Sequence, residues 1–388
     1  MKILIVHNRY KTSAPSGENI YVDKEVFALK SLGYEVETCY IENDDLKYGI
    51  FSYVVVLFEL LLPIISFIIV FRADRSFKPD IIHFHNTFPR IGWLSLRYFA
   101  RKAFLTVHNY RLFCANGVAL RADNVCILCS DHGNLWSTMR YKCYRNSYLS
   151  TLAVKIYIAL IKRFGKLEAF QGIFCFSDYQ KKLILTFHPD LSPVIKIKNN
   201  IHEFGKNLRP NRIKSKPIAL FVGRFSVEKG IHDLVQCILT YPDMFKEVHF
   251  VGGTISDLRN LGCEDIQVLQ NVKVHGKVSH ADVKDYLKHC DLLLVPSTCL
   301  EGQPTVVFEA LEQGCLPVVS TVPTLVDLST KLGLKCVIDF TDHKNFYDNY
   351  VRMLDAYHND LELIAGNLSS AQKLFALTLD FYEENIRF

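Results

Sequence analysis

Two glutamates within residues 296–310 have a spacing that suits a sugar nucleotide. Glu301 and Glu309 follow the apolar segment 292–295, a predicted strand, and Glu309 falls in the first turns of a helix predicted to end near Gly314. The N-terminus of such a helix exposes backbone N–H groups that suit a phosphate. A carboxylate beside it can accept hydrogen bonds from the hydroxyls of a ribose or a sugar. The pairing therefore indicates a nucleotide-sugar site rather than a plain phosphate site.

A second charged motif lies upstream, where residues 221–230 read FVGRFSVEKG. Together the two segments resemble the G-R-x4-K-G and E-x7-E motifs of retaining glycosyltransferases of the family 4 type (glycosyl transferases group 1), in the branch that assembles surface polysaccharides. The resemblance covers most of the chain. It implies an α/β protein of the GT-B architecture, in which two Rossmann-like domains face a cleft.

The resemblance also implies roles for individual residues. Arg224 and Lys229 would neutralise the donor diphosphate in place of a divalent cation, so we expect no cofactor to be required for catalysis. Glu309 would hold the donor ribose, and Glu301 would face the transferred sugar. Many relatives have glycine where this chain has Pro304, which has no N–H to offer a phosphate. The predicted donor-binding residues are Gly17, Gly223, Arg224, Lys229, Glu301, Pro304, Thr305, Val306 and Glu309.

Candidate residues in the first half lie just after predicted strands, where open α/β sheets bind their ligands. The polar loop 8–18 follows the first strand, and the family places its glycine, Gly17, near the donor phosphates. Taken alone, Gly17 would be interpreted as a turn residue. His108 ends the predicted strand 103–108, and the family has a histidine here close to the transferred sugar. We therefore predict His108 to be catalytic, together with Glu301, Arg224 and Lys229.

His83 and His85 end a neighbouring strand in the same way as His108. Neutral imidazole both donates and accepts a hydrogen bond, so a histidine at a strand end can also be purely structural. We expect one of these three histidines to be a structural hydrogen-bonding residue.

Apolar strands alternate with amphipathic helices along the chain, which predicts parallel sheets covered on both faces. We predict an N-terminal Rossmann-like acceptor domain over residues 1–200 and a C-terminal Rossmann-like nucleotide-sugar donor domain over residues 201–370. A polar linker is predicted at residues 199–216. The helix predicted over 371–388 either crosses back to the first domain or caps the second. The predicted strands are residues 2–6, 34–40, 80–85, 103–108, 172–177 and 218–222.

The composition fits two globular domains. The chain has 388 residues, of which 49% are hydrophobic and 22% charged. Its net charge of +5 is too small to indicate a nucleic-acid binder, but it favours anionic lipid or phosphorylated substrates. Residues 1–7 are predicted to begin a strand at once, without the shape of a signal peptide. Together with 12 cysteines this predicts a reducing, cytoplasmic location.

The apolar run 50–71 is long enough for a transmembrane helix. We reject that interpretation because a span would divide one sheet between two sides of the membrane, and because Glu59 and Pro63 lie near its centre. A buried helix and a helix lying in the bilayer surface remain equally open. The basic and apolar stretch 149–170 favours contact with the membrane, although an ordinary amphipathic surface helix would have the same pattern.

Four cysteines gather in a predicted insertion of the first domain, residues 111–147: Cys114, Cys126, Cys129 and Cys143. The spacing of Cys126 and Cys129 lets two thiolates bind one ion, and four thiolates would complete a tetrahedral structural zinc site. The stretch 143–147 is similar to one found with four cysteines in some family 4 relatives. Free thiols are the alternative; a redox pair is disfavoured because no thioredoxin-like pattern surrounds it.

The sequence thus predicts a retaining enzyme that moves a hexose-type sugar from a UDP- or GDP-linked donor to a hydroxyl. The expected acceptor is a polyprenyl-diphosphate-linked saccharide, used in O-antigen, capsule or exopolysaccharide assembly. Peripheral contact with the cytoplasmic face of the inner membrane is expected. The alternatives are a catalytically inert GT-B scaffold at the membrane and a GT-B sugar-nucleotide epimerase. A zinc-dependent nucleic-acid binder is disfavoured by the near-balanced charge.

Overall fold

The computed structural model describes residues 1–9, 17–42, 58–198, 213, 215–334 and 336–359. These form two compact units. The first contains residues 1–119 and the segment that starts at residue 126; the second starts after residue 201 and also includes the hairpin 120–125. The predicted linker lies almost entirely outside the described residues, and the predicted helix 371–388 wholly so. The predicted domain boundary therefore stays a prediction.

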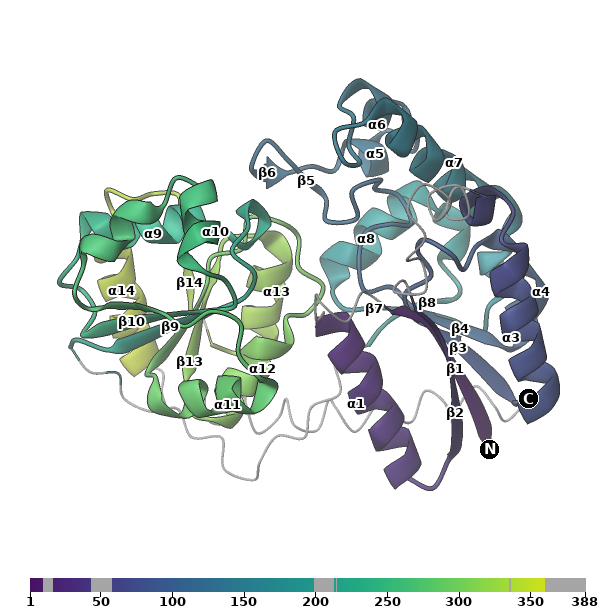
Figure 1. The fold of residues 1–388 in the computed structure, drawn as a ribbon, viewed down its shortest axis with the longest axis horizontal. Coiled ribbons are helices and arrows are strands. Elements are labelled where there is room, and N and C mark those ends of the chain that lie inside the picture. Colours follow the sequence, from purple (N-terminus) through teal and green to yellow (C-terminus); the bar gives the residue numbers. More distant parts are fainter. Residues whose placement is uncertain (10–16, 43–57, 199–212, 214, 335, 360–388) are drawn as a thin grey trace. The chain divides into compact units, whose positions relative to one another are not determined.

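The first unit contains a six-stranded parallel sheet with helices packed against it (Figure 1). Residues 3–8 of its strand β1 are buried without interruption, as expected for a parallel strand covered on both faces. The strand order is β2-β1-β3-β4-β7-β8. The strands are β1 Lys2–Arg9, β2 Glu35–Glu42, β3 Ile81–Phe84, β4 Ala103–Thr106, β7 Gly172–Cys175 and β8 Ile195–Ile197. The longer helices are α1 Gly17–Ser31, α3 Ile64–Phe77, α4 Trp93–Phe99, α7 Tyr148–Phe164 and α8 Asp178–Phe187.

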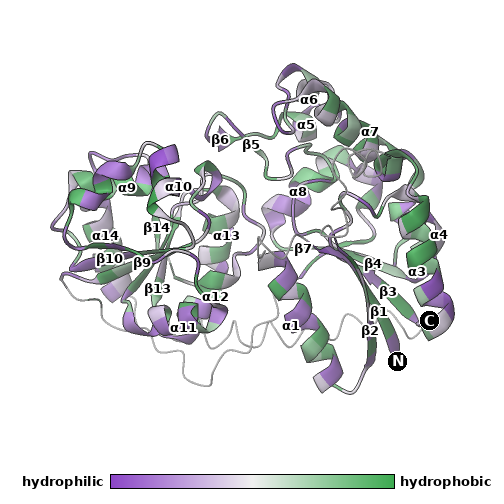
Figure 2. Cartoon of the chain, viewed as in Figure 1, coloured by the Kyte–Doolittle hydropathy of each residue, from purple (hydrophilic) through white to green (hydrophobic). Residues whose placement is uncertain are grey.

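The second unit repeats this plan with a second six-stranded parallel sheet, ordered β11-β10-β9-β12-β13-β14. Its central strands consist mainly of hydrophobic residues, whereas its helices carry hydrophilic residues on the side away from the sheet (Figure 2). The strands are β9 Ile218–Val222, β10 Glu247–Val251, β11 Val272–Val274, β12 Leu292–Val295, β13 Leu316–Ser320 and β14 Val337–Ile338. The helices are α9 Ile231–Thr240, α10 Ile255–Asn260, α11 His280–His289, α12 Thr305–Glu312, α13 Pro323–Lys331 and α14 Phe346–Asn359.

The strand order of each sheet reverses once, and such a reversal leaves a crevice beyond the carboxyl ends of two strands. In the second unit the reversal lies between β9 and β12, which precede the two charged motifs. In the first unit it lies between β1 and β3, close to the predicted histidines. The prediction of parallel α/β sheets is confirmed, and both candidate regions lie at a reversal.

The described part of the apolar run is broken by Pro63 into a helical turn, residues 58–61, and α3. The carboxylate of Glu59 accepts hydrogen bonds from the backbone N–H groups of Ile65 (2.9 Å) and Ser66 (3.0 Å). Glu59 thus satisfies N–H groups in the first turn of α3. Among the described residues, no helix is both long enough and apolar enough to cross a bilayer. Residues 50–57 of the run lie outside the described part.

α3 is only half-covered by the rest of the first unit. Ser66 and Val70 are fully buried. Its opposite side is apolar and 37–43% exposed, at Ile64, Ile65, Ile68 and Ile69. Of the two interpretations of this run, a wholly buried helix does not fit α3, and the exposed isoleucines leave the bilayer-surface interpretation open.

Gly230 holds the two motifs of the second unit against each other. Its φ of +66° is left-handed, and a Cβ there would lie 1.8 Å from the carbonyl oxygen of Pro296. Gly262 has the same φ of +66°, but a Cβ there would meet no neighbouring atom within 4 Å. Gly262 thus requires glycine only for its backbone conformation, whereas Gly230 requires it also because a side chain would clash with Pro296.

Gly262→Ala should lower the free energy of unfolding by about 1 kcal/mol, the strain of a left-handed alanine. Gly230→Ala carries the same strain plus a clash with the backbone of Pro296, so it should lower that free energy by about 2 kcal/mol more. Guanidinium titrations of both variants measure the difference. Equal losses at the two positions would show that the close approach to Pro296 is not a constraint.

Candidate functional site

The loops that follow β9 and β12 are joined by hydrogen bonds. The backbone N–H of Thr298 donates to the carbonyl of Glu228 (3.2 Å), and the Thr298 hydroxyl donates to the carbonyl of Val227 (3.1 Å). The hydroxyl of Ser320, at the end of β13, donates to the carbonyl of Ser297 (2.6 Å). Residues from three neighbouring strand ends thus fix the loop that carries Glu301.

Lys229 and Glu301 form an ion pair at the centre of these loops. Lys229 Nζ lies 2.6 Å from Glu301 Oε1, and the hydroxyl of Ser297 donates to the same oxygen at 2.6 Å. Burial works to raise the pKa of Glu301, but the charge of Lys229 and the two hydrogen bonds outweigh it and lower the pKa. Burial works to lower the pKa of Lys229, but the charge of Glu301 outweighs it and raises that pKa. Both groups are therefore charged at neutral pH.

Arg224 lies beside this pair and is open to solvent. Its Nη2 is 3.1 Å from Glu228 Oε1, and 68% of its side chain is exposed. Its positive charge acts on both Lys229 and Glu301. Two cations on a β-strand-to-helix loop can neutralise a diphosphate, and an exposed guanidinium can bind phosphate oxygens bidentately. The structure therefore brings together Arg224, Lys229 and Glu301, three of the predicted site residues.

Glu309 lies on α12, the helix that directly follows the loop carrying Glu301. The helix begins at Thr305, and the residue at its N-cap position is Pro304, which supplies no side-chain cap. First-turn N–H groups of a helix remain available for an anion. Glu309 is 97% buried, and its Oε1 lies 3.9 Å from Nε2 of His280, the first residue of α11. A carboxylate in this position can accept hydrogen bonds from paired hydroxyls.

Sequence reasoning missed Ser297 and His280. Ser297 directly follows the strand end, so its place in the loop was visible, but its bond to Glu301 depends on how the loop folds back. His280 approaches Glu309 only because α11 packs on α12. No spacing in the sequence reports that contact.

The first unit brings its predicted histidines together at its own strand ends. His108 Nε2 lies 3.0 Å from His85 Nδ1, and the ring of Tyr21 from α1 packs edge-on against His108 at 5.0 Å between centroids. Burial is the main cause that lowers the pKa of His108, to about 3, so its ring is neutral at physiological pH. His83 is fully buried, with its Nε2 2.8 Å from Thr106 Oγ1, as expected of a structural histidine. Gly17 is the first residue of α1.

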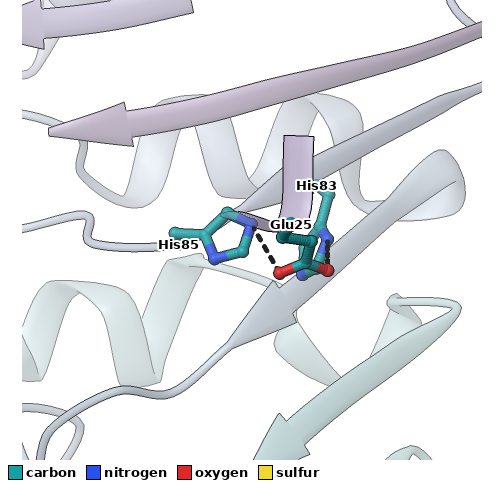
Figure 3. A group of neighbouring side chains, drawn as sticks. All are labelled: Glu25, His83 and His85. Atoms are coloured by element: carbon teal, nitrogen blue, oxygen red, sulfur yellow. Dashed lines mark ion pairs between the residues drawn. The ribbon is translucent and has the colours of Figure 1, made fainter. Parts of the chain in front are cut away.

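A buried carboxylate, Glu25 of α1, lies against these histidines and was missed by sequence reasoning. Its oxygens lie 3.7 Å from Nδ1 of His83 and 3.8 Å from Nε2 of His85 (Figure 3). Glu25 also forms a buried ion pair with Lys198, which follows β8. The helical period of α1 places Glu25 one turn after Tyr21, on its buried face.

The four cysteines of the insertion are free thiols in the structure. Burial is the main cause that raises the pKa of Cys129 to about 12. Repulsion from the other three cysteines, when they are thiolates, raises it further. Among the described residues, which include all four, Glu25, His83 and His85 are the one group of three whose ligand atoms all lie within 4.8 Å of one another. The zinc site therefore stays a prediction.

Residues 204–362 match a family model described as glycosyl transferases group 1. A teichuronic acid biosynthesis glycosyltransferase of Bacillus subtilis is 37% identical over 99 residues, which are 24% of this chain and 22% of the relative. An N,N'-diacetylbacillosaminyl-diphospho-undecaprenol alpha-1,3-N-acetylgalactosaminyltransferase of Campylobacter jejuni is 32% identical over 117 residues, 30% of this chain and 29% of the relative. The chain thus spans less than a third of either relative.

The fold has solved counterparts over its full length. A structure from E. coli, described as trehalose-6-phosphate bound with UDP-2-fluoro glucose, superposes with a TM-score of 0.61 at 11% identity and covers 100% of this chain and 99% of that chain. At this identity the likeness shows the fold alone. It confirms the predicted architecture of two Rossmann-like domains. The family match supports a transferase whose second unit carries the charged motifs.

Glu301→Gln should destabilise the protein in a pH-dependent way. The folded state lowers the pKa of Glu301 from its ordinary value of 4.5, so the stabilisation is present above that value and is lost as the pH falls through the lowered pKa. We expect the variant to melt about 2–4 °C below the wild type at pH 7, and the gap to narrow as the pH is lowered from 7 to below 4.5. Thermal melts across this range measure it. A gap of the same size at every pH would contradict the ion pair.

Proposed function

We propose that this protein is a retaining glycosyltransferase that moves a hexose-type sugar from a nucleotide-sugar donor to a hydroxyl of a lipid-linked saccharide, in the assembly of a surface polysaccharide. The observation that carries the proposal is the Lys229–Glu301 pair, held at the strand-order reversal with Arg224 beside it. The match of residues 204–362 to glycosyl transferases group 1 supports it.

The charges of the second unit suit the donor half of this reaction. As the bond between the sugar and the diphosphate breaks, negative charge grows on the phosphate oxygens, and cations already in place stabilise it without reorganisation. Lys229 has three N–H donors and uses one on Glu301, so others can reach a phosphate. We assign Arg224 and Lys229 to the diphosphate. This assignment needs no divalent cation.

The carboxylates suit the two sugars of the donor. We assign Glu309, in the buried middle of α12, to the ribose hydroxyls, and Glu301 to the transferred sugar. His108, partly exposed and neutral, is assigned to a sugar hydroxyl. The acceptor hydroxyl then attacks from the face that the diphosphate leaves, and its proton passes to the departing phosphate oxygen. Of the UDP- and GDP-linked donors that the sequence predicts, we propose the UDP-linked one for the first test; the E. coli structure of the same fold is described as bound with UDP-2-fluoro glucose.

The first unit has a surface that suits a lipid-linked acceptor. Trp136 of helix α6 (Trp136–Arg140) is 74% exposed, and Leu149 of α7 is 81% exposed. Lysines lie over exposed rings here, Lys155 4.0 Å from the ring of Trp136 and Lys142 4.6 Å from that of Tyr148. Residues 136–164 contain no Asp or Glu but six basic residues: Arg140, Lys142, Arg145, Lys155, Lys162 and Arg163.

Such a mixture of exposed apolar and basic side chains binds anionic bilayer surfaces. We therefore propose that α6, α7 and the exposed isoleucines of α3 contact the membrane, where a polyprenyl-linked acceptor would reside; Figure 2 shows hydrophobic residues on α3 and α7. The Campylobacter jejuni relative, whose name specifies a diphospho-undecaprenol acceptor, supports this choice of acceptor.

Lys229→Ala should lower sugar transfer by about a hundredfold or more, because a cation positioned for the leaving diphosphate is lost. Turnover is measured with the donor that the wild type uses, and circular dichroism checks that the variant is folded. Lys273→Ala is the matched control, since Lys273 forms a 2.6 Å pair with Glu247 in the same unit, away from the motifs. Near-normal turnover of a folded Lys229→Ala variant would reject the assignment of Lys229 to the leaving diphosphate.

Trp136→Ala/Leu149→Ser should weaken binding to vesicles with anionic headgroups at least about tenfold, because each side chain contributes well over 1 kcal/mol when buried in the acyl boundary. Flotation with vesicles of phosphatidylglycerol and phosphatidylcholine measures the effect. Val268→Ser is the control, as Val268 is 77% exposed on the second unit. If all three proteins float equally, α6 and α7 are not the membrane contact.

A further inference from the structure

A carboxylate and an ammonium group are buried together beneath His108. Glu25 is fully buried, Lys198 is 98% buried, and the two form an ion pair. Burying two charges costs desolvation free energy, and their mutual attraction offsets this cost only when the geometry is good. A buried ion pair is therefore weak evidence of a stabilising role. His85, also buried, lies between this pair and His108. This arrangement points to a role beyond packing.

A metal ion is one candidate for such a role, since Glu25, His83 and His85 have ligand atoms within 4.8 Å of one another. The ammonium group of Lys198 already binds the carboxylate that would be the anionic ligand. A divalent cation would meet that positive charge in a region from which water is excluded, where like charges repel strongly. The ammonium group of Lys198 therefore already supplies the positive charge that a metal ion would bring, and we do not interpret the cluster as a metal site.

The two nitrogens of His85 face different partners. Nε2 faces Oε2 of Glu25 at 3.8 Å, and Nδ1 faces Nε2 of His108 at 3.0 Å. Burial holds the pKa of His85 well below its usual value, so the ring carries one N–H and one lone pair. A carboxylate attracts an N–H and repels a lone pair, so it places the proton on Nε2. Nδ1 of His85 then accepts a hydrogen bond from Nε2–H of His108.

We propose that Glu25, paired with Lys198, acts through His85 to hold His108 as the Nε2–H tautomer, so that Nδ1 of His108 presents its lone pair to a hydroxyl of the bound ligand. Glu25 and His85 are positioning residues in this scheme. The identity of the hydroxyl, on the donor sugar, rests on the proposed function; the tautomer does not. Among the described residues, Nδ1 of His108 has no hydrogen-bond partner.

The second unit contains the same carboxylate–histidine–histidine series, and there the last histidine has a hydroxyl partner. Oε2 of Glu247 lies 3.2 Å from Nε2 of His249, and Nδ1 of His249 lies 2.9 Å from Nε2 of His275. The hydroxyl of Tyr286 then lies 2.9 Å from Nδ1 of His275. In this chain, therefore, a carboxylate–histidine–histidine series ends on a hydroxyl. The series that begins at Glu25 ends on His108, which is partly exposed. A hydroxyl of a ligand can therefore take the position that the Tyr286 hydroxyl occupies in the second series.

The tautomers can be observed by NMR of the full chain labelled with ¹⁵N-histidine, in which long-range couplings separate Nδ1–H from Nε2–H rings. The signal of His108 is assigned by its disappearance in His108→Asn. We expect Nε2–H for His108 in the wild type. In Glu25→Gln/Lys198→Met, which removes both buried charges together, we expect a mixture of tautomers or the Nδ1–H form. Glu247→Gln, in the second series, should change the signals of His249 and His275 and leave His108 unaltered.

An Nδ1–H tautomer of His108 in the wild type would overturn the proposal, even if the double variant failed to fold. So would an unchanged Nε2–H signal in a folded double variant. Neither result depends on a donor, so both are separate from failure of the proposed function. With an active donor, the double variant should lose at least about tenfold in kcat with little change in nucleotide binding. Loss of nucleotide binding alone would indicate a structural role and contradict the proposal.

Discussion

The ion pair between Lys229 and Glu301 is the interaction on which the candidate site depends. It joins a loop after β9 to a loop after β12, and Gly230 makes the contact feasible because a larger residue would strike the Pro296 carbonyl. Each charge stabilises the other against burial, as their opposite pKa shifts show. The pair is therefore a structural link between the motifs, and in the proposed function Lys229 is also a preorganised cation for a phosphate.

The two parallel sheets explain why chemistry gathers where it does. A parallel strand is buried on both faces, so polar side chains are placed at its end, and neighbouring ends share one edge. In the second unit this edge collects Arg224, Lys229 and Glu301; in the first it collects His85 and His108. In the first unit a buried ion pair, Glu25–Lys198, also lies next to this edge, beside His85.

Much of this arrangement could be predicted from sequence, because strands and motif loops are local. The strands at 2–6 and 218–222 begin where the structure begins them, and the two motifs that carry Lys229 and Glu301 are visible in the sequence, although their ion pair is not. What could not be predicted depends on packing between distant elements. Glu25 lies in an unremarkable helical turn, and only the packing of α1 on the sheet brings it to His85. Contact between α11 and α12 likewise sets His280 near Glu309.

Binding of a nucleotide sugar tests the central claim most directly. Thermal shifts of the purified protein would be measured against UDP-, GDP- and ADP-sugars, each with and without EDTA, beside EDTA alone. The account predicts that one nucleotide class raises the melting temperature and does so equally in EDTA, because Arg224 and Lys229 supply the positive charge. A shift abolished by EDTA, where EDTA alone has no effect, would contradict that assignment. No shift with any donor would contradict the donor site itself.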